Sequence, residues 1–223
     1  MLSTPQGEDD SFLWEHSLRV AQSALAIAAV PEIEVLHPDR QVLYAAGLYH
    51  ASGWAAAVRA GKLDRGRVLL APLSESIAED GAAILESRLA DLLPPEMLRR
   101  AARAIRAVPH RGTDLVETQI VAEARNLEEF GLLAIWPSVR KAMIEGKGVQ
   151  AALDTWRRKR EYHFWPARLK DAFRFDAVRQ IAERRLATLE SFMEELARQH
   201  TGHDIADLAK SADHNRGRAP ARD

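Results

Sequence analysis

Cysteine is missing from this chain of 223 residues, which excludes disulfide bonds, thiolate metal sites and a cysteine nucleophile. Long apolar runs are missing too, since none approaches the roughly 20 residues that a membrane-spanning helix requires. The first ten residues are polar and acidic, unlike a secretion signal. These absences predict a cytoplasmic protein with no membrane partner.

An excess of charge of either sign is also lacking. The chain has 31 Lys and Arg residues against 32 Asp and Glu residues, a net charge of -1, so no global field attracts it to nucleic acid. The sequence contains no Gly-rich phosphate loop, no Gly-x-Ser-x-Gly elbow and no His-Glu-x-x-His pair. We therefore expect neither a nucleic-acid partner nor one of these common catalytic centres.

Helical periodicity dominates what is present, because apolar residues recur about every 3.6 positions in almost every segment. No segment shows the alternation of apolar and polar residues that is typical of strands. The pattern predicts an all-α fold, built as a single helical bundle. The expected helices span residues 11–28, 39–50, 74–89, 95–108, 115–130, 137–145, 149–159 and 176–200.

Proline and glycine mark the expected breaks between these helices. Pro31 is expected to mark the end of the first helix, and Ser52-Gly53 to stop the second. Pro95 suits the first turn of a helix. The predicted organisation is a flexible N-terminus over residues 1–10, one helical domain over 11–205 and a disordered tail over 206–223.

Two histidines stand at distinctive positions of the first two predicted helices. His50 follows an apolar helical run and precedes a break of small residues that begins with Ala51. His16 lies three residues before Arg19, which places both side chains on about the same helix face. Imidazole is a frequent metal ligand, so both positions are candidates for a site.

Five segments in this order resemble the HD-domain superfamily of metal-dependent phosphohydrolases, and in particular its bacterial subgroup similar to nucleoside-triphosphate pyrophosphohydrolases. The resemblance covers about residues 10 to 200 and implies an HD-type helical bundle. The matching segments are Trp14–Val20, Leu48–Ala51, 104–110, 117–128 and 163–170.

The resemblance implies a site in which two histidines and two aspartates bind a divalent cation. Such a cation lowers the pKa of bound water and stabilises the charge of a phosphoryl group. His16 and His50 match the two histidine positions, but the two aspartate positions hold Ala51 and Arg125. Two neutral imidazoles beside a guanidinium bind a dication poorly, because the guanidinium repels the ion that carboxylates would attract.

We therefore expect no cofactor; if one binds, it is a divalent Mn, Co, Mg, Fe or Zn ion held by His16 and His50 as residual ligands. Replacement carboxylates could come from Glu123, from Glu128 or from the 75–80 segment. Glu128 lies on the same side of its helix as the lost ligand position, whereas Glu123 points about 160° away. Glu128 is therefore the better candidate.

The candidate ligand-binding residues are His16, Arg19, His50, His110 and Arg125. Arg19 could bind a phosphate or form a surface ion pair. Arg125 is expected to fill the space of the lost cation inside the pocket. His110 could line the pocket or cap its helix, and the other two histidines could be ordinary core residues.

The first functional hypothesis is a degenerate HD-domain protein without metal-dependent hydrolysis. Its residual pocket would bind a nucleotide or another phosphorylated small molecule, or act in regulation. The alternative is an active metal-dependent phosphohydrolase that acts on a nucleotide or a small phosphate ester. A third hypothesis is a structural module that forms homo-oligomers through the long final helix over 176–200.

Overall fold

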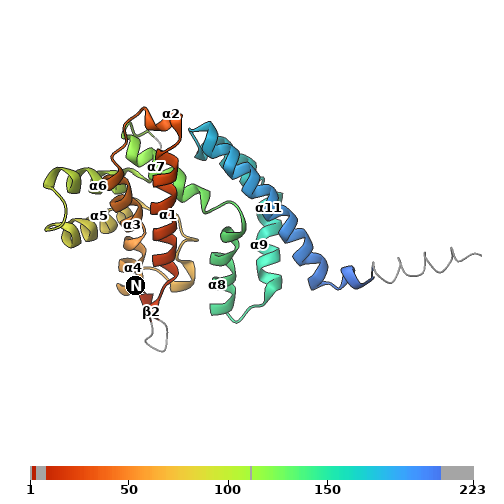
Figure 1. Ribbon diagram of the computed structural model, residues 1–223. Helices are drawn as coiled ribbons and strands as arrows, with labels where there is room; N and C mark the ends of the chain where they lie inside the picture. The colour runs from red at the N-terminus through yellow and green to blue at the C-terminus, as the bar shows by residue number, and fades with distance from the viewer. Residues whose placement is uncertain (1, 4–8, 111, 207–223) are drawn as a thin grey trace, which may run out of the picture.

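The computed structural model describes residues 2–3, 9–110 and 112–206, and these confirm the all-α fold class (Figure 1). Two short strands, β1 (Leu2–Ser3) and β2 (Asp9–Asp10), pair antiparallel with Leu2 opposite Asp10. They fall within the predicted flexible N-terminus, and two residues are too few to show an alternating pattern. Residues 4–8 of that segment, and the predicted tail from residue 207 on, lie outside the described residues.

Helices make up the rest of the regular structure of the described residues. In chain order they are α1 (Phe12–Ala28), α2 (Pro31–Glu34), α3 (Arg40–Tyr49), α4 (Ser52–Arg59), η1 (Arg65–Arg67), α5 (Glu75–Leu89), α6 (Pro95–Ala107), α7 (Val116–Leu127), η2 (Leu132–Ile135), α8 (Trp136–Ile144), α9 (Val149–Glu161), α10 (Phe164–Ala172) and α11 (Asp176–His200).

The predicted helix starts rest on local capping chemistry. The Asp39 side chain accepts hydrogen bonds from the backbone N–H groups of Gln41 and Val42 at the start of α3. Ser74 does the same for Ile77 at the start of α5, at 3.3 Å. Pro95 occupies the first turn of α6, where its missing N–H costs nothing.

The expected stop at Ser52-Gly53 is wrong, because these two residues begin α4 instead. His50 and Ala51 keep right-handed helical dihedral angles, so the chain bends between α3 and α4 without a long break. The Ser52 hydroxyl donates to the Tyr49 carbonyl at 2.7 Å across this bend. Gly53 has a packing role here, since a Cβ atom on it would lie 1.9 Å from the Ile77 carbonyl oxygen on α5.

Other elements also differ from the sequence prediction, which included none of α2, η1, η2 and α10. Pro31 does follow the first helix, but it also starts the short helix α2. Helix α10 was not predicted, and it begins after His163, whose backbone is left-handed with φ of 50°. A non-glycine residue in that region is uncommon and leaves no plain sequence signal.

The core lies in the N-terminal part, where α1, α3, α5, α6 and α7 pack on one another (Figure 1). Helices α1 and α3 cross closely at Gly47, where a Cβ atom would lie 2.7 Å from the Ala21 Cα. Trp54, Leu43 and Leu85 are fully buried in this core. Helices α8, α9 and α11 form a second group beside α1 (Figure 1).

A helix that crosses a bilayer must be both long and apolar. None of the helices of the described residues meets both conditions.

Candidate functional site

A pair of histidines lies where α1 and α3 pack together. His16 is buried on α1, and His50 is completely buried at the C-terminal end of α3. Their Nε2 atoms are 3.1 Å apart, a hydrogen-bonding distance. The structure therefore brings the two predicted metal-ligand positions together, and it joins them directly.

The partners of His50 determine where the protons of this pair lie. Its Nδ1 is 2.7 Å from the Gly47 carbonyl oxygen, which can only accept, so Nδ1 carries a hydrogen. Burial lowers the pKa of His50 well below 6.5, and the nearby His16 and Arg125 lower it further, so the ring is neutral. The His50 Nε2 then has a lone pair and accepts the Nε2–H of His16.

A carboxylate approaches the other nitrogen of His16. The Glu128 carboxylate is 3.5 Å from His16 Nδ1 and accepts a 2.9 Å hydrogen bond from Arg19 Nε. Burial raises the pKa of Glu128, but the contacts with His16 and Arg19 outweigh burial and leave this pKa below its ordinary value. Burial lowers the pKa of His16 in spite of this carboxylate. Arg19 therefore neutralises a largely buried carboxylate instead of forming the surface ion pair considered from the sequence.

The two positions that the resemblance assigns to aspartate hold a methyl group and a cation. Ala51 is completely buried. The Arg125 guanidinium lies 5.8 Å from the centroid of the Trp54 ring, within the range of a cation–π contact. Burial lowers the pKa of Arg125. Arg125 thus packs against an aromatic face beside the histidine pair.

The carboxylates considered as replacement metal ligands point elsewhere. Glu128 lies on the Nδ1 side of His16, whereas the two imidazoles meet through Nε2. Glu123 accepts backbone N–H groups at the start of α11. In the 75–80 segment, Glu75 is 3.8 Å from His110, and Glu79 binds Arg106.

The donor set at the histidine pair therefore does not fit a metal ion. No group of three or more His, Cys, Asp or Glu side chains suited to one ion occurs among the described residues. A divalent cation at this point would have two nitrogen donors, no aimed carboxylate, and a guanidinium as its neighbour.

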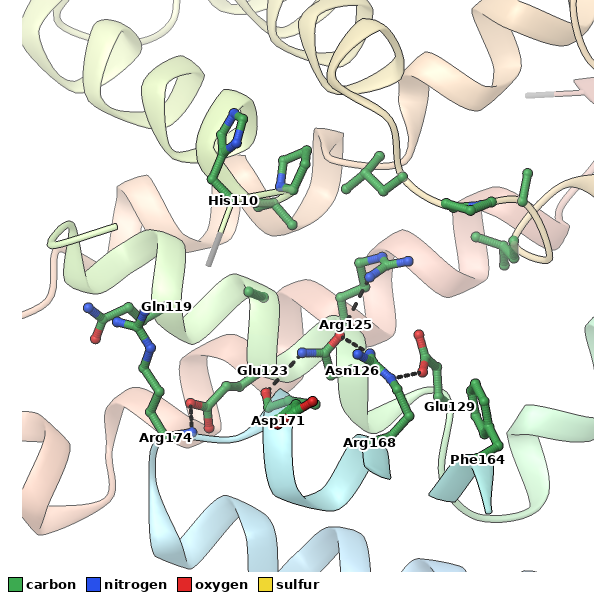
Figure 2. A pocket seen from close by; sticks show the side chains of 18 of the residues that line it. His110, Gln119, Glu123, Arg125, Asn126, Glu129, Phe164, Arg168, Asp171 and Arg174 are labelled. Carbon is green, nitrogen blue, oxygen red and sulfur yellow. Dashed lines mark hydrogen bonds and ion pairs between the residues drawn. The ribbon is translucent and has the colours of Figure 1, made fainter. Parts of the chain in front are cut away.

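A cavity of about 600 Å³ borders Arg125, and its size is typical of small-molecule sites (Figure 2). Helix α7 forms one wall, the 69–73 and 108–110 segments a second, and α9, α10 and Arg174, which follows α10, a third. His110 stands at its edge with a half-exposed side chain. The charged side chains that line the cavity are Glu123, Arg125, Glu129, Lys159, Arg168, Asp171 and Arg174, with His110 beside them.

A hydrogen-bond network holds the basic side chains of the cavity in place (Figure 2). Arg168 donates to Glu129 at 2.8 Å and to the Asn126 side-chain oxygen at 2.9 Å. The Asn126 amide nitrogen donates to the Ala172 carbonyl at 3.0 Å, which fixes its orientation. Arg125 reaches the same Asn126 oxygen at 3.5 Å, a weak contact. Asn126 thereby orients both guanidinium groups, that of Arg125 on the α7 wall and that of Arg168 on the wall that includes α10.

One acid of the cavity has an unusual environment. Glu123 is almost completely buried, and one of its oxygens accepts the N–H groups of Arg174 at 2.6 Å and Phe175 at 3.3 Å. Its other oxygen has no hydrogen-bond partner among the residues that the structure describes. Burial raises the pKa of Glu123 to about 7, against the opposing effect of these two bonds. Near neutral pH this carboxyl group is therefore partly protonated.

A narrow crevice of about 70 Å³ connects the cavity with the histidine pair. His16, Arg19 and Glu128 line it, and it shares Arg125 and Lys159 with the cavity. The five predicted site residues thus fall in one region: four surround the crevice or lie directly behind it, and His110 lies at the far edge of the cavity.

The sequence interpretation did not identify several residues that shape this region. Glu129 carries no motif that distinguishes it from surface residues, and Asn126 lies in the 117–128 segment that carried part of the resemblance. Arg168 and Phe164 lie in the 163–170 segment that carried part of the resemblance, and this was the one available signal for them.

The chain was compared with known proteins. No family model matches it, and no curated protein does. Two structures of Bacillus subtilis YpgQ are similar: the complex with ADP, with 22% identity and a TM-score of 0.53, and selenomethionine YpgQ, with 21% identity and a TM-score of 0.55. Each alignment covers 83% of this chain and 88% of the YpgQ chain. At this identity, the similarity establishes the fold alone.

Proposed function

We propose that the chain is a degenerate HD-domain protein that binds a nucleotide or a related phosphorylated small molecule and does not perform metal-dependent hydrolysis. The observation that carries this proposal is the direct hydrogen bond between His16 and His50, beside a cavity bordered by Arg125. No group of three or more potential metal ligands occurs beside this pair among the described residues, and Arg125 stands where the resemblance expects a carboxylate.

The cavity favours an anionic ligand that also carries neutral polar groups. Its wall presents Arg125, Arg168 and Arg174 and the ammonium group of Lys159, against three acids. Arginine side chains bind phosphate oxygens through paired N–H groups. The size of the cavity suits a mononucleotide, and YpgQ, which shares the fold, is known in complex with ADP.

The environment of Glu123 adds a condition to anion binding. A phosphate beside an ionised Glu123 would be repelled, whereas a protonated Glu123 could donate a hydrogen bond to it. Because the pKa of Glu123 is about 7, a modest uptake of protons would remove the repulsion. We therefore expect ligand binding to favour the protonated form.

Titration calorimetry of the full chain with ADP, in the presence of a chelator, tests the binding part of the proposal. We expect saturable binding that Arg125→Gln weakens by about tenfold or more, since a bond to a charged group contributes about 1.5–3 kcal/mol. Arg103→Gln is the matched control, because Arg103 is exposed on α6 and does not line the cavity. Unchanged affinity in Arg125→Gln would contradict the placement of the ligand.

Elemental analysis and a turnover assay test the loss of hydrolysis. We expect less than stoichiometric transition metal in protein purified without chelator. We also expect no hydrolysis of nucleotides with Mn²⁺, Co²⁺ or Mg²⁺ above that of a His16→Ala/His50→Ala double variant. One equivalent of metal together with turnover above this control would favour the active phosphohydrolase instead.

A further inference from the structure

The cavity of about 600 Å³ has two chemically different ends. Arg125 and Lys159 line the end that continues into the crevice. Gln119 and Glu123 line the other end, and Figure 2 shows them on the side of the cavity away from Phe164. A nucleotide has a matching asymmetry, with phosphates at one end and a base at the other. Its phosphates would lie toward Arg125, and its base would lie between Gln119 and Glu123 and the rest of the lining.

The side-chain amide of Gln119 is fixed in one orientation. Its Nε2 donates a 2.8 Å hydrogen bond to the Thr113 carbonyl oxygen, which can only accept, so the amide cannot be turned over. Gln119 lines the cavity, and its Oε1 accepts no hydrogen bond from the residues that the structure describes. Oε1 of Gln119 is therefore an acceptor that a ligand can use.

One oxygen of Glu123 is also left for a ligand. Its Oε1 accepts the N–H groups of Arg174 and Phe175, whereas Oε2 is buried and has no partner in the described part of the chain. A buried polar atom without a partner costs free energy, which a ligand at this point would recover. In the protonated carboxyl group the hydrogen lies on Oε2, because two N–H groups already occupy Oε1. Oε2 then offers a hydrogen-bond donor.

The charged groups around Glu123 come from three segments. Arg174, which follows α10, and Arg179 of α11 both lower the pKa of Glu123. Burial raises this pKa and prevails, so that the pKa is about 7. Asp171 of α10 and His110 are the other titratable groups that line the cavity near Glu123 (Figure 2). The donor form of Glu123 is therefore well populated at and below neutral pH.

The two free oxygen atoms lie on one face of α7. Gln119 and Glu123 are four residues apart, so their side chains are neighbours one helical turn apart. Together they present an acceptor beside a donor. Pro72, Leu73 and Pro109 supply apolar lining to the same cavity, which suits the flat face of an aromatic ring.

We propose that Gln119 and protonated Glu123 recognise the base of the bound nucleotide, through an edge that presents a donor beside an acceptor. Adenine has such an edge in its 6-amino group and N7. Gln119 Oε1 would accept from the amino group, and the Glu123 O–H would donate to the ring nitrogen. This inference rests on the proposed binding of a nucleotide, and it assigns Glu123 to the base and not to a phosphate.

Titration calorimetry of the full chain with adenosine at pH 6 and pH 8 tests the role of Glu123. Adenosine has no phosphate, so repulsion of a phosphate cannot affect the result. We expect binding to be about tenfold weaker at pH 8, because the protonated fraction of a group with a pKa of about 7 falls from about nine-tenths to about one-tenth. Glu123→Gln should bind adenosine equally at both pH values, since its amide keeps an acceptor for the two N–H groups and offers an N–H donor to the base. Glu190→Gln, exposed on α11, is the control and should keep the tenfold change.

Purine riboside, which lacks the 6-amino group, tests the role of Gln119. The wild type should bind it about fivefold more weakly than adenosine, because the Gln119 oxygen is then left without a donor. Gln119→Met should remove this preference. Gln199→Met is its control, because Gln199 is exposed on α11 and outside the cavity, and it should retain the preference. Circular dichroism at both pH values would confirm that each variant is folded.

Three results would overturn the inference and leave the proposed function intact: ADP that adenosine cannot displace, adenosine binding whose pH dependence is absent or persists in Glu123→Gln, and equal affinity for adenosine and purine riboside. A pH dependence seen with ADP but not with adenosine would place Glu123 beside a phosphate instead. If neither ADP nor adenosine binds, the proposed function itself is refuted, and this inference with it.

Discussion

Glu123 shows how one buried acid can connect the cavity with the fold. Its carboxylate accepts the two N–H groups at the junction of α10 and α11, so it acts as the cap that no side chain of α11 itself provides. The same group lines the cavity. A change in its protonation therefore affects both the stability of the helix start and the charge that a ligand meets.

The raised pKa of Glu123 makes a prediction about stability and pH. Its pKa is about 7 in the folded chain against an ordinary 4.5, so the folded state binds more protons between these values. Stability is therefore lost as the pH rises through this window. Glu123→Gln keeps an acceptor oxygen but cannot titrate. Between pH 4.5 and pH 8, its free energy of unfolding should fall by about 3 kcal/mol less than that of the wild type.

Urea unfolding of both proteins at pH 4.5, 6 and 8 measures this difference. Glu190→Gln is the control, because Glu190 is exposed on α11. The interpretation fails if wild type and Glu123→Gln differ by the same free energy of unfolding at all three pH values.

At the scale of the elements, the close contact between α4 and α5 is possible because Gly53 has no side chain. Gly53→Ala would place a Cβ atom 1.9 Å from the Ile77 carbonyl oxygen, so the two helices must separate. We expect a loss of about 2 kcal/mol or more, as overpacking a tight contact typically costs. Thermal and urea unfolding measure the loss.

Gly112→Ala is the control for this prediction, because a Cβ atom there would meet no atom within 4 Å. It should change the free energy of unfolding by no more than about 0.5 kcal/mol. Equal effects of the two substitutions would show that α4 and α5 do not depend on the close contact.

The same elements show what the sequence could predict. Helix α11 was predicted with the bounds it has, because its apolar stripe is long and Asp176 marks its start. The start of α4 was missed, because Ser and Gly normally interrupt helices, and only the tertiary contact with α5 explains why Gly53 lies inside one. Helix α10 was missed because its start depends on a left-handed His163.

The site was predictable to a similar degree. The positions of His16, His50 and Arg125 followed from the order of the segments, and the structure brings them into one region. The contact between Glu128 and His16 Nδ1 could not be predicted from the sequence, because residue spacing along a helix does not determine which imidazole nitrogen a carboxylate faces. The stacking of Arg125 on Trp54 likewise depends on how α4 and α7 pack.

At the scale of the whole molecule, the cavity of about 600 Å³ lies where α7 meets α9, α10 and Arg174 (Figure 2). Its walls come from segments far apart in the chain, so a ligand in it would contact both groups of helices at once. Binding should therefore stabilise the two groups against each other.

Hydrogen exchange with and without saturating ADP tests this coupling. We expect slower exchange of backbone amides in two separate segments, residues 69–73 and residues 164–174, while the α8 face around Met143 is unchanged. Protection confined to one of the two segments would place the ligand on a single wall of the cavity and contradict this arrangement.

The hydrogen bond between the two imidazoles also bears on how the protein is produced in a cell. In the proposed metal-free form, the two inward-facing nitrogens bond each other, so the newly synthesised domain need not acquire an ion before α1 and α3 can pack. Its yield should therefore not depend on the supply of trace metals in the growth medium, and a cell limited for these nutrients could still produce it at full abundance.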